Sequence, residues 1–173
     1  NTLEDPRGLW LEQFREVTVQ MPTWCMNRRV FDAVGGFVES PPEDGEGEDL
    51  IFFQRHLDVH GPANVAAGRP SLVRAGTPED PVLLYRWSPG SGTARVSRQQ
   101  LLKIRTAAFE RRVLSRPEWG RFAVWGAGRD ARNFVNELSP PLRSRVAAMI
   151  DVDPKKCGKK YENHRHQPPT VIP

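Results

Sequence analysis

RFAVWGAGRDARNFVNELSPPLRSRVAAMIDVD, residues 121–153, is the stretch of this sequence that decides a fold. An apolar run enters a glycine turn, and residues 129–138 then show the spacing of a helix, which Pro140-Pro141 end. A second apolar run, 145–150, leads into acidic residues. This order of strand, helix and strand predicts a parallel sheet with a right-handed crossover. The final PTVIP, 169–173, predicts the beginning of a third strand.

The glycine turn of this unit also carries a binding motif. Residues 126–131, GAGRDA, have the form G-x-G-x-x-A of a dinucleotide fingerprint. Glycines let the backbone approach a pyrophosphate, and a helix N-terminus supplies N–H donors. Asp151 follows at the end of the second strand, where an acid can bind a ribose hydroxyl. Gly126, Gly128 and Asp151 are therefore the candidate cofactor-binding residues, and a folded module that binds nothing is the alternative. We expect a shallow, weak anion site and not a full NAD site.

Two helices are predicted on either side of an acidic loop in the first third of the chain. The segment CMNRRVFDAVGGF predicts a helix over Arg28–Val34, with Gly35-Gly36 as its C-terminal cap. The segment GEDLIFFQRHL predicts a second helix over Asp49–Val59, which Gly61-Pro62 end.

Two carboxylates, Glu48 and Asp49, lead directly into the apolar part of the second helix. Negative charge is stabilised at the positive end of a helix, and the apolar run behind these residues would hold them at the rim of a core. A general base that takes a proton from a hydroxyl needs such a positioned carboxylate. The alternative is a solvated acidic loop with an ordinary pair of charges at a helix N-terminus.

Several short motifs follow one another from about Leu9 to the C-terminus. They are Pro22-Thr23-Trp24, then Arg28 with Phe31 and Gly35-Gly36-Phe37, then Glu48-Asp49-Leu50 with Phe52, Phe53, His56 and Leu57, then Leu83-Leu84-Tyr85-Arg86, Trp125-Gly126-Ala127-Gly128 and Asp151-Val152-Asp153. In this order they resemble the acceptor side of the inverting glycosyltransferases of family 2, which have the GT-A fold. Within that family they resemble the UDP-GlcNAc:βGal β-1,3-N-acetylglucosaminyltransferase-like proteins.

The resemblance implies an α/β fold in which residues 1–94 are the acceptor-side half of a GT-A glycosyltransferase domain. The nucleotide-binding half, with its own DxD motif and a divalent metal (Mn or Mg), is expected ahead of Asn1, so we expect the chain alone to have no transferase activity. Residues 95–117 are expected to form a basic connecting helix, and residues 118–173 a small Rossmann-like β-α-β module.

The resemblance also implies which residues act. Asp49 is the expected catalytic base, and Glu48 shapes its electrostatic field. Trp24, Arg28 and Arg86 are the expected substrate-binding residues. The implied reaction transfers a sugar, expected to be N-acetylglucosamine, from a UDP donor to the hydroxyl of a glycan or other acceptor. A non-catalytic nucleotide- or metabolite-binding module is the alternative function.

No metal site is predicted within this chain. Asp151-Val152-Asp153 has the form of the DxD motif, but in GT-A enzymes that motif precedes the acceptor half, whereas here it follows. Relatives commonly have a histidine where this chain has Ser88, and serine is a poor metal ligand.

Charge is distributed unevenly along the 173 residues, whose net charge is +4. Residues 1–60 hold 5 Lys or Arg and 12 Asp or Glu, and residues 61–173 hold 20 and 9. The predicted helix over 95–116 is basic and amphipathic, a pattern found in nucleic-acid-binding and membrane-binding helices. No nucleic-acid motif accompanies it, and no apolar run approaches the ~18 residues of a membrane helix. We therefore predict no nucleic-acid partner and no membrane segment. The two cysteines, Cys25 and Cys157, are far apart and suggest a reducing compartment, so a cytoplasmic location is predicted.

Overall fold

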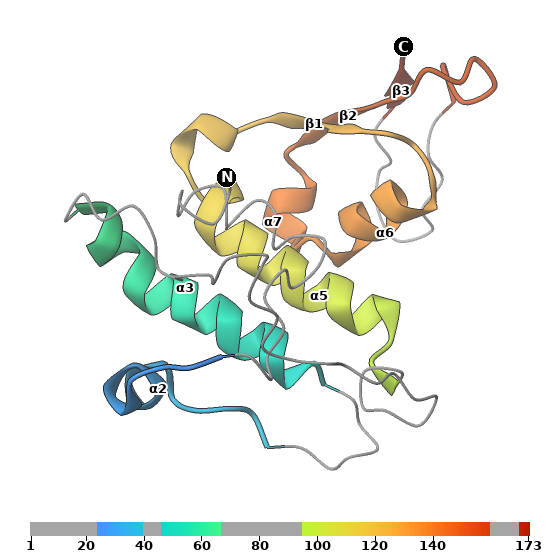
Figure 1. Ribbon diagram of the computed structural model, residues 1–173. Helices are drawn as coiled ribbons and strands as arrows, with labels where there is room; N and C mark the ends of the chain where they lie inside the picture. Colours follow the sequence, from blue (N-terminus) through green and yellow to red (C-terminus); the bar gives the residue numbers. More distant parts are fainter. Residues whose placement is uncertain (1–23, 40–45, 67–94, 160–169) are drawn as a thin grey trace, which may run out of the picture. The chain divides into compact units, whose positions relative to one another are not determined.

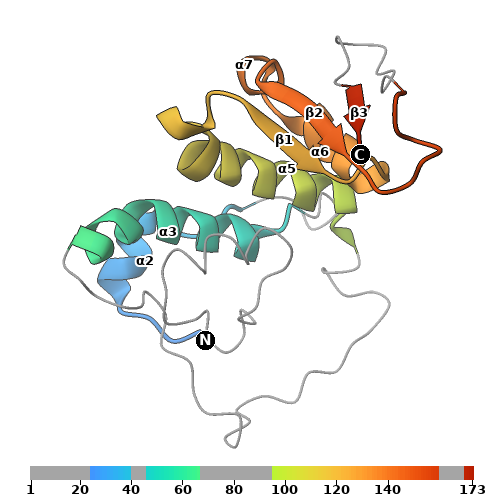
Figure 2. The ribbon, with the colours of Figure 1, turned by 90° about the horizontal axis from the view of Figure 1, so that it is seen from above.

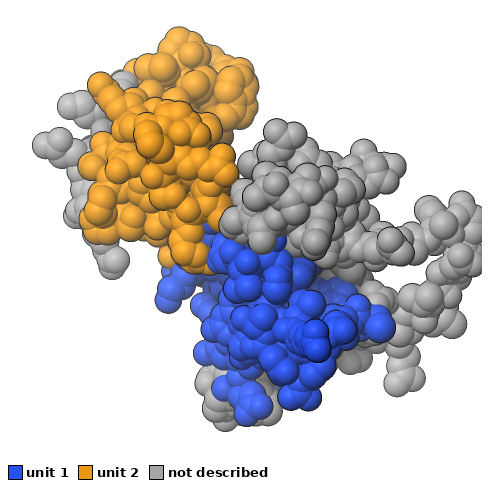
Figure 3. All heavy atoms as spheres, turned by 90° about the vertical axis from the view of Figure 1, so that its left-hand side faces the viewer, with its two compact units in different colours: residues 1–108 blue, residues 109–173 orange. Residues whose placement is uncertain are grey.

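The computed structural model describes residues 24–39, 46–66, 95–159 and 170–173. These residues form a mixture of helices and a small parallel sheet, so the predicted α/β class is confirmed. The chain divides into two compact units, residues 1–108 and residues 109–173, which Figure 3 colours separately. The division falls inside the segment 95–117. No helix of the described residues is long and apolar enough to cross a membrane.

Helix α2 (Arg28–Val34) of the first unit begins and ends where the sequence predicts. The Asn27 side chain caps its N-terminus and accepts a hydrogen bond from the Arg29 N–H at 2.9 Å. Gly35 has a φ of 87°, in the left-handed region that favours glycine. The N–H groups of Gly35 and Gly36 donate to the carbonyls of Asp32 and Phe31, at 3.1 and 3.2 Å. This pair of bonds is a Schellman cap.

Helix α3 (Glu48–Ala66) is longer than predicted, because it continues through Gly61-Pro62. The predicted end at Val59 is wrong. A proline inside a helix costs about 3 kcal/mol through the lost N–H and ring contacts. The four Leu and Phe side chains that α3 buries, Leu50, Phe52, Phe53 and Leu57, all precede Pro62 and stabilise the predicted part of the helix. A Gly-Pro pair disfavours a helix without forbidding one, so it did not fix the end of α3.

An aromatic cluster joins α2 to α3 within the first unit. The Phe52 ring of α3 lies 5.8 Å from Phe31 of α2 and 4.6 Å from Phe37, measured between centroids. Phe31 and Phe37 are themselves 5.8 Å apart. Trp24 lies 5.9 Å from Phe52 and 5.7 Å from Phe53. Such ring pairs stabilise beyond the area that they bury, so the cluster fixes how α2 packs on α3.

Helix α5 (Arg98–Phe109) corresponds to the predicted basic helix. The Ser97 hydroxyl begins it by accepting from the Gln100 N–H at 3.0 Å. The helix continues as one π-helical turn, η2 (Glu110–Leu114), in which the Ser115 N–H reaches the Glu110 carbonyl at 2.9 Å. A short 3-10 turn, η3 (Pro117–Trp119), follows.

The second unit contains the predicted strand, helix and strand, and the predicted third strand (Figures 1 and 2). Its elements are β1 (Phe122–Trp125), α6 (Arg129–Glu137), α7 (Pro140–Arg143), β2 (Val146–Ile150) and β3 (Thr170–Ile172). The strands pair in parallel in the order β1-β2-β3. The core between sheet and helices is apolar, and its buried members include Phe122, Val135, Leu138, Met149 and Val171.

Helix α7 is an element that the sequence did not predict. Pro140-Pro141 end the segment of α6, as expected, but they also begin a new short helix. Proline fits the first helical position, because its missing N–H has no partner within the helix there. The preceding Ser139 N–H donates to the Glu110 carboxylate at 2.5 Å, and this contact ties α7 to the π-helical turn.

Candidate functional site

The candidate site lies where β1 turns into α6, at the carboxyl end of the parallel strands. Ligands of open α/β sheets bind at this end of the sheet. Gly126 leaves β1 with a φ of 92°, and its N–H donates to the Ile150 carbonyl at 2.6 Å. Gly128 then caps α6 in an extended conformation, with φ −80° and ψ −177°.

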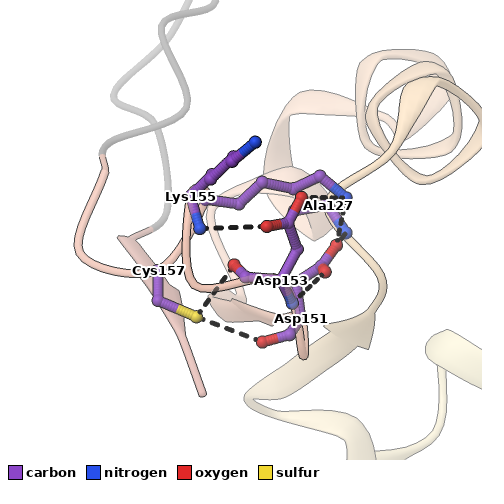
Figure 4. Close-up of polar contacts among 6 residues, drawn as sticks. Ala127, Asp151, Asp153, Lys155 and Cys157 are labelled. Carbon is purple, nitrogen blue, oxygen red and sulfur yellow. Dashed lines mark hydrogen bonds and ion pairs between the residues drawn. The ribbon is translucent and has the colours of Figure 1, made fainter.

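The buried carboxylate of Asp151 ties this glycine turn to the end of β2 (Figure 4). Its Oδ2 accepts from the Ala127 N–H at 2.8 Å and from Lys156 Nζ at 2.9 Å. Its Oδ1 accepts from the Asp153 N–H at 2.9 Å. The hydrogen bonds from Asp153, Lys156 and Ala127, in that order of importance, lower the pKa of Asp151 from 3.8 to about 2. The carboxylate is therefore ionised at all physiological pH values.

The turn after β2 is held by the same group of residues. Asp153 Oδ1 accepts from the Lys155 N–H at 3.0 Å, and the Cys157 thiol donates to the Asp151 carbonyl at 3.2 Å (Figure 4). Lys156 Nζ lies 2.9 Å from Asp151 and 3.8 Å from Asp153. The ammonium thus takes the position that a cation would share between the two carboxylates, so these acids do not fit a metal centre. Within the described residues, no three His, Cys, Asp or Glu side chains gather as metal ligands.

A shallow hollow of about 510 Å³, mostly open to solvent, lies beside the glycine turn. Its lining comes from the end of β1, the turn and the first residues of α6: Trp125, Gly126, Gly128, Arg129, Asp130 and Ala131. Trp125 is 77 % exposed, far more than a tryptophan in a core. Asp151 does not line the hollow, although its hydrogen bond to Ala127 shapes the turn that does.

The carboxylates predicted for catalysis lie in the first turn of α3, as predicted. Glu48 is exposed, and Asp49 is half-buried, with its Oδ1 accepting from the Leu50 N–H at 2.7 Å. Trp24 is half-buried and packs on Phe52 and Phe53. These two rings lie on α3, one helical turn after Glu48 and Asp49. Helix α3 is therefore the element that positions both the candidate base and the candidate aromatic platform.

The two predicted arginines are placed differently. Arg28 is exposed at the start of α2, where its Nε lies 2.8 Å from Asp32 and its guanidinium lies 5.6 Å from the Phe31 ring. Arg86 lies outside the described residues. The structure brings the three cofactor-binding candidates together, because Asp151 accepts a hydrogen bond from Ala127 between Gly126 and Gly128. The Asp151 carboxylate is, however, already hydrogen-bonded to three groups of this chain, which leaves it little capacity to bind a ribose.

No family model matches this chain, and no solved structure matches it. The functional argument therefore depends on the residues and their geometry.

Two residues of the site were not predicted to act there. Lys156 follows Asp151 by five positions, and only the turn after β2 brings its ammonium back to the carboxylate. Trp125 appeared in the sequence only as part of the motif Trp125-Gly126-Ala127-Gly128, and its exposed side chain lines the hollow. A tryptophan directly before a glycine turn is the signal that could have found it.

Proposed function

We propose that this chain is the C-terminal portion of an inverting GT-A glycosyltransferase, which transfers a sugar from a UDP donor to an acceptor hydroxyl. One observation supports the proposal most. Phe31 and Phe37 belong to one motif of the family resemblance and Phe52 to another, and the three rings meet in one aromatic cluster. The same cluster fixes α3, whose first turn holds Asp49. These two motifs thus pack together on the helix that carries the proposed catalytic residue.

Asp49 acts as the general base in this proposal. It takes the proton from the acceptor hydroxyl while that oxygen attacks the anomeric carbon of the donor, and UDP leaves from the opposite face with inversion. The first turn of α3 stabilises the carboxylate and holds it in place. In this proposal the neighbouring Glu48 shapes the electrostatic field of Asp49. Half-burial of Asp49 keeps it at the surface, where an acceptor can reach it.

The acceptor sugar would stack on Trp24, whose ring is fixed by Phe52 and Phe53. N-acetylglucosamine remains the proposed donor sugar, and Arg28 and Arg86 the proposed contacts to substrate. In GT-A enzymes a divalent metal neutralises the charge of the diphosphate. The described residues of this chain do not fit such a metal, so its ligands are proposed for the nucleotide-binding half.

The test is turnover by a polypeptide that carries a nucleotide-binding half together with this chain. Asp49→Asn should lower kcat about 10²–10⁴-fold, the usual contribution of a general base, and leave the Kd for UDP unchanged. Glu39→Gln is the control, because it removes an exposed carboxylate of the same unit outside the proposed site. Equal turnover by Asp49→Asn and the control would rule out Asp49 as the base.

A second candidate function is favoured by the hollow beside the glycine turn. The second unit would then be a Rossmann-like module that binds a nucleotide or metabolite without catalysis, at the turn of Gly126 and Gly128. Calorimetric titration with pyrophosphate, UDP-sugars and NAD(H) tests this function. We expect weak binding of pyrophosphate and no tight, stoichiometric binding of NAD(H). Absence of binding by every one of these ligands would exclude the second function.

A further inference from the structure

The two glycines of the turn are required for different reasons. Gly126 has a positive φ of 92°, which side chains rarely adopt. Gly128 has an ordinary extended backbone, and a Cβ added to it would meet no atom within 4 Å. Neither backbone conformation nor packing therefore demands a glycine at position 128. Because Gly128 has no side chain, its backbone is exposed at the edge of the hollow, and a ligand can approach it there.

The exposed ring of Trp125 faces away from the core of the second unit. Phe122 and Val124 of the same strand pack into the core beside α6 and α7, which lie on one side of the sheet (Figure 1). Side chains alternate along a strand, so Trp125 projects from the other side. Its cross-strand neighbours are Ile150 of β2 and, beyond it, Ile172 of β3. A flat, apolar surface thus borders the hollow that Gly128 leaves open.

Asp151 is unsuited to bind a ribose as the fingerprint would require. A carboxylate has about four acceptor positions, and three are taken by Ala127, Asp153 and Lys156. The carboxylate is 9 % exposed and does not line the hollow. Recognition of a ligand beyond its phosphate is therefore left to the other side of the hollow, where Trp125 lies.

We propose that the hollow binds a mononucleotide whose base stacks on Trp125 and whose phosphate lies against the bare backbone of Gly128. This inference rests on the second candidate function and names its ligand class. Arg129 supplies positive charge for the phosphate. Its exposed side chain lies 3.9 Å from that of Asp130, which also lines the hollow, and this weak surface ion pair opens when the phosphate binds. Stacking on an aromatic side chain tolerates any base, so the site distinguishes nucleotides from inorganic phosphates and not one base from another.

The experiment compares UDP with inorganic pyrophosphate, using calorimetry and tryptophan fluorescence on the whole chain. Stacking contributes about 10-fold or more to affinity for each base. UDP should bind about 10-fold more tightly than pyrophosphate and should quench tryptophan fluorescence. Trp125→Ala should still bind pyrophosphate, but it should lose both the tighter binding of UDP and the quenching. Trp125→Phe should retain part of the difference. Trp119→Phe, which alters a partly exposed tryptophan away from the hollow, should change nothing.

Gly128→Ala should weaken both UDP and pyrophosphate, because its methyl group enters the space left for the phosphate. Gly120→Ala is the matched control, since Gly120 has a helical φ of −58°, ordinary contacts and no place in the hollow. Equal affinity for UDP and pyrophosphate in the wild type, unchanged by Trp125→Ala, would overturn the stacking proposal and leave the second function standing. Binding of neither ligand would overturn both.

Discussion

The carboxylate of Asp151 accepts a hydrogen bond of 2.8 Å from the backbone N–H of Ala127, across 24 positions of sequence. The bond joins the end of β2 to the turn between β1 and α6, which is the wall of the candidate hollow. Asp151 is thus a positioning residue for the glycine turn, and the geometry of any ligand site there depends on it.

Asp151→Asn should destabilise the second unit and loosen the glycine turn. The amide keeps the shape of the side chain but loses the negative charge that pairs with Lys156. Its NH₂ group cannot accept a hydrogen bond, so one of the N–H donors that face the carboxylate is left without an acceptor. Chemical denaturation should give a lower midpoint, and amide exchange at Ala127 should become faster. Glu118→Gln, an exposed carboxylate in η3, is the control. A midpoint equal to that of the control would contradict the role of Asp151.

The contribution of Asp151 to stability should disappear in acid. Its pKa of about 2 in the folded chain lies below the ordinary value of 3.8, so the folded state binds its proton more weakly than the unfolded state does. The stabilisation is complete above pH ~5 and is lost as the pH falls from ~4 toward ~2. The difference in unfolding midpoint between wild type and Asp151→Asn should therefore be constant at pH 5–7 and shrink below pH 4. A difference that stays constant down to pH 2 would refute the assigned pKa.

Alanine should have unequal effects on stability at the two glycines of the turn. Gly126→Ala forces a side chain into the left-handed region and should destabilise by about 1–2 kcal/mol. Gly128→Ala meets no neighbour and restricts the unfolded chain, but alanine is a poorer N-cap of α6 than glycine. These two effects oppose each other, so Gly128→Ala should change stability less than Gly126→Ala does. Urea denaturation of the two variants measures both effects. A loss of stability in Gly128→Ala as large as in Gly126→Ala would show that position 128 needs glycine for the fold itself.

Phe52 should be the residue on which the packing of α2 against α3 depends most. Phe52→Ala removes a side chain that is 2 % exposed and contacts Trp24, Phe31 and Phe37, so it should cost about 3–5 kcal/mol. Val59→Ala removes a side chain that is 47 % exposed on the same helix and should cost far less. Thermal unfolding followed by near-ultraviolet circular dichroism measures the loss of aromatic packing. Similar costs for the two substitutions would contradict the described cluster.

Short-range patterns in the sequence were sufficient to predict several of the elements, although not α7 or the end of α3. The bounds of α2, its glycine cap, the start of α3 at the paired carboxylates and the strand-helix-strand unit with its third strand are all found where the patterns place them. Each depends on residues within a few positions of one another, because helix caps, glycine turns and apolar runs act through local backbone geometry and local burial.

Contacts between distant residues decided the rest. The sequence places Asp151 at the tip of β2, but only folding brings its carboxylate to the Ala127 N–H and to the ammonium of Lys156. These hydrogen bonds make Asp151, a candidate ribose ligand, a residue that holds the glycine turn in place. Helix α3 continues past Pro62, where the local pattern predicted its end, and the packing of α6 and α7 on one side of the sheet left Trp125 exposed. Long-range hydrogen bonds and burial depend on which surfaces meet in the folded chain. Patterns among neighbouring residues do not predict which surfaces these are.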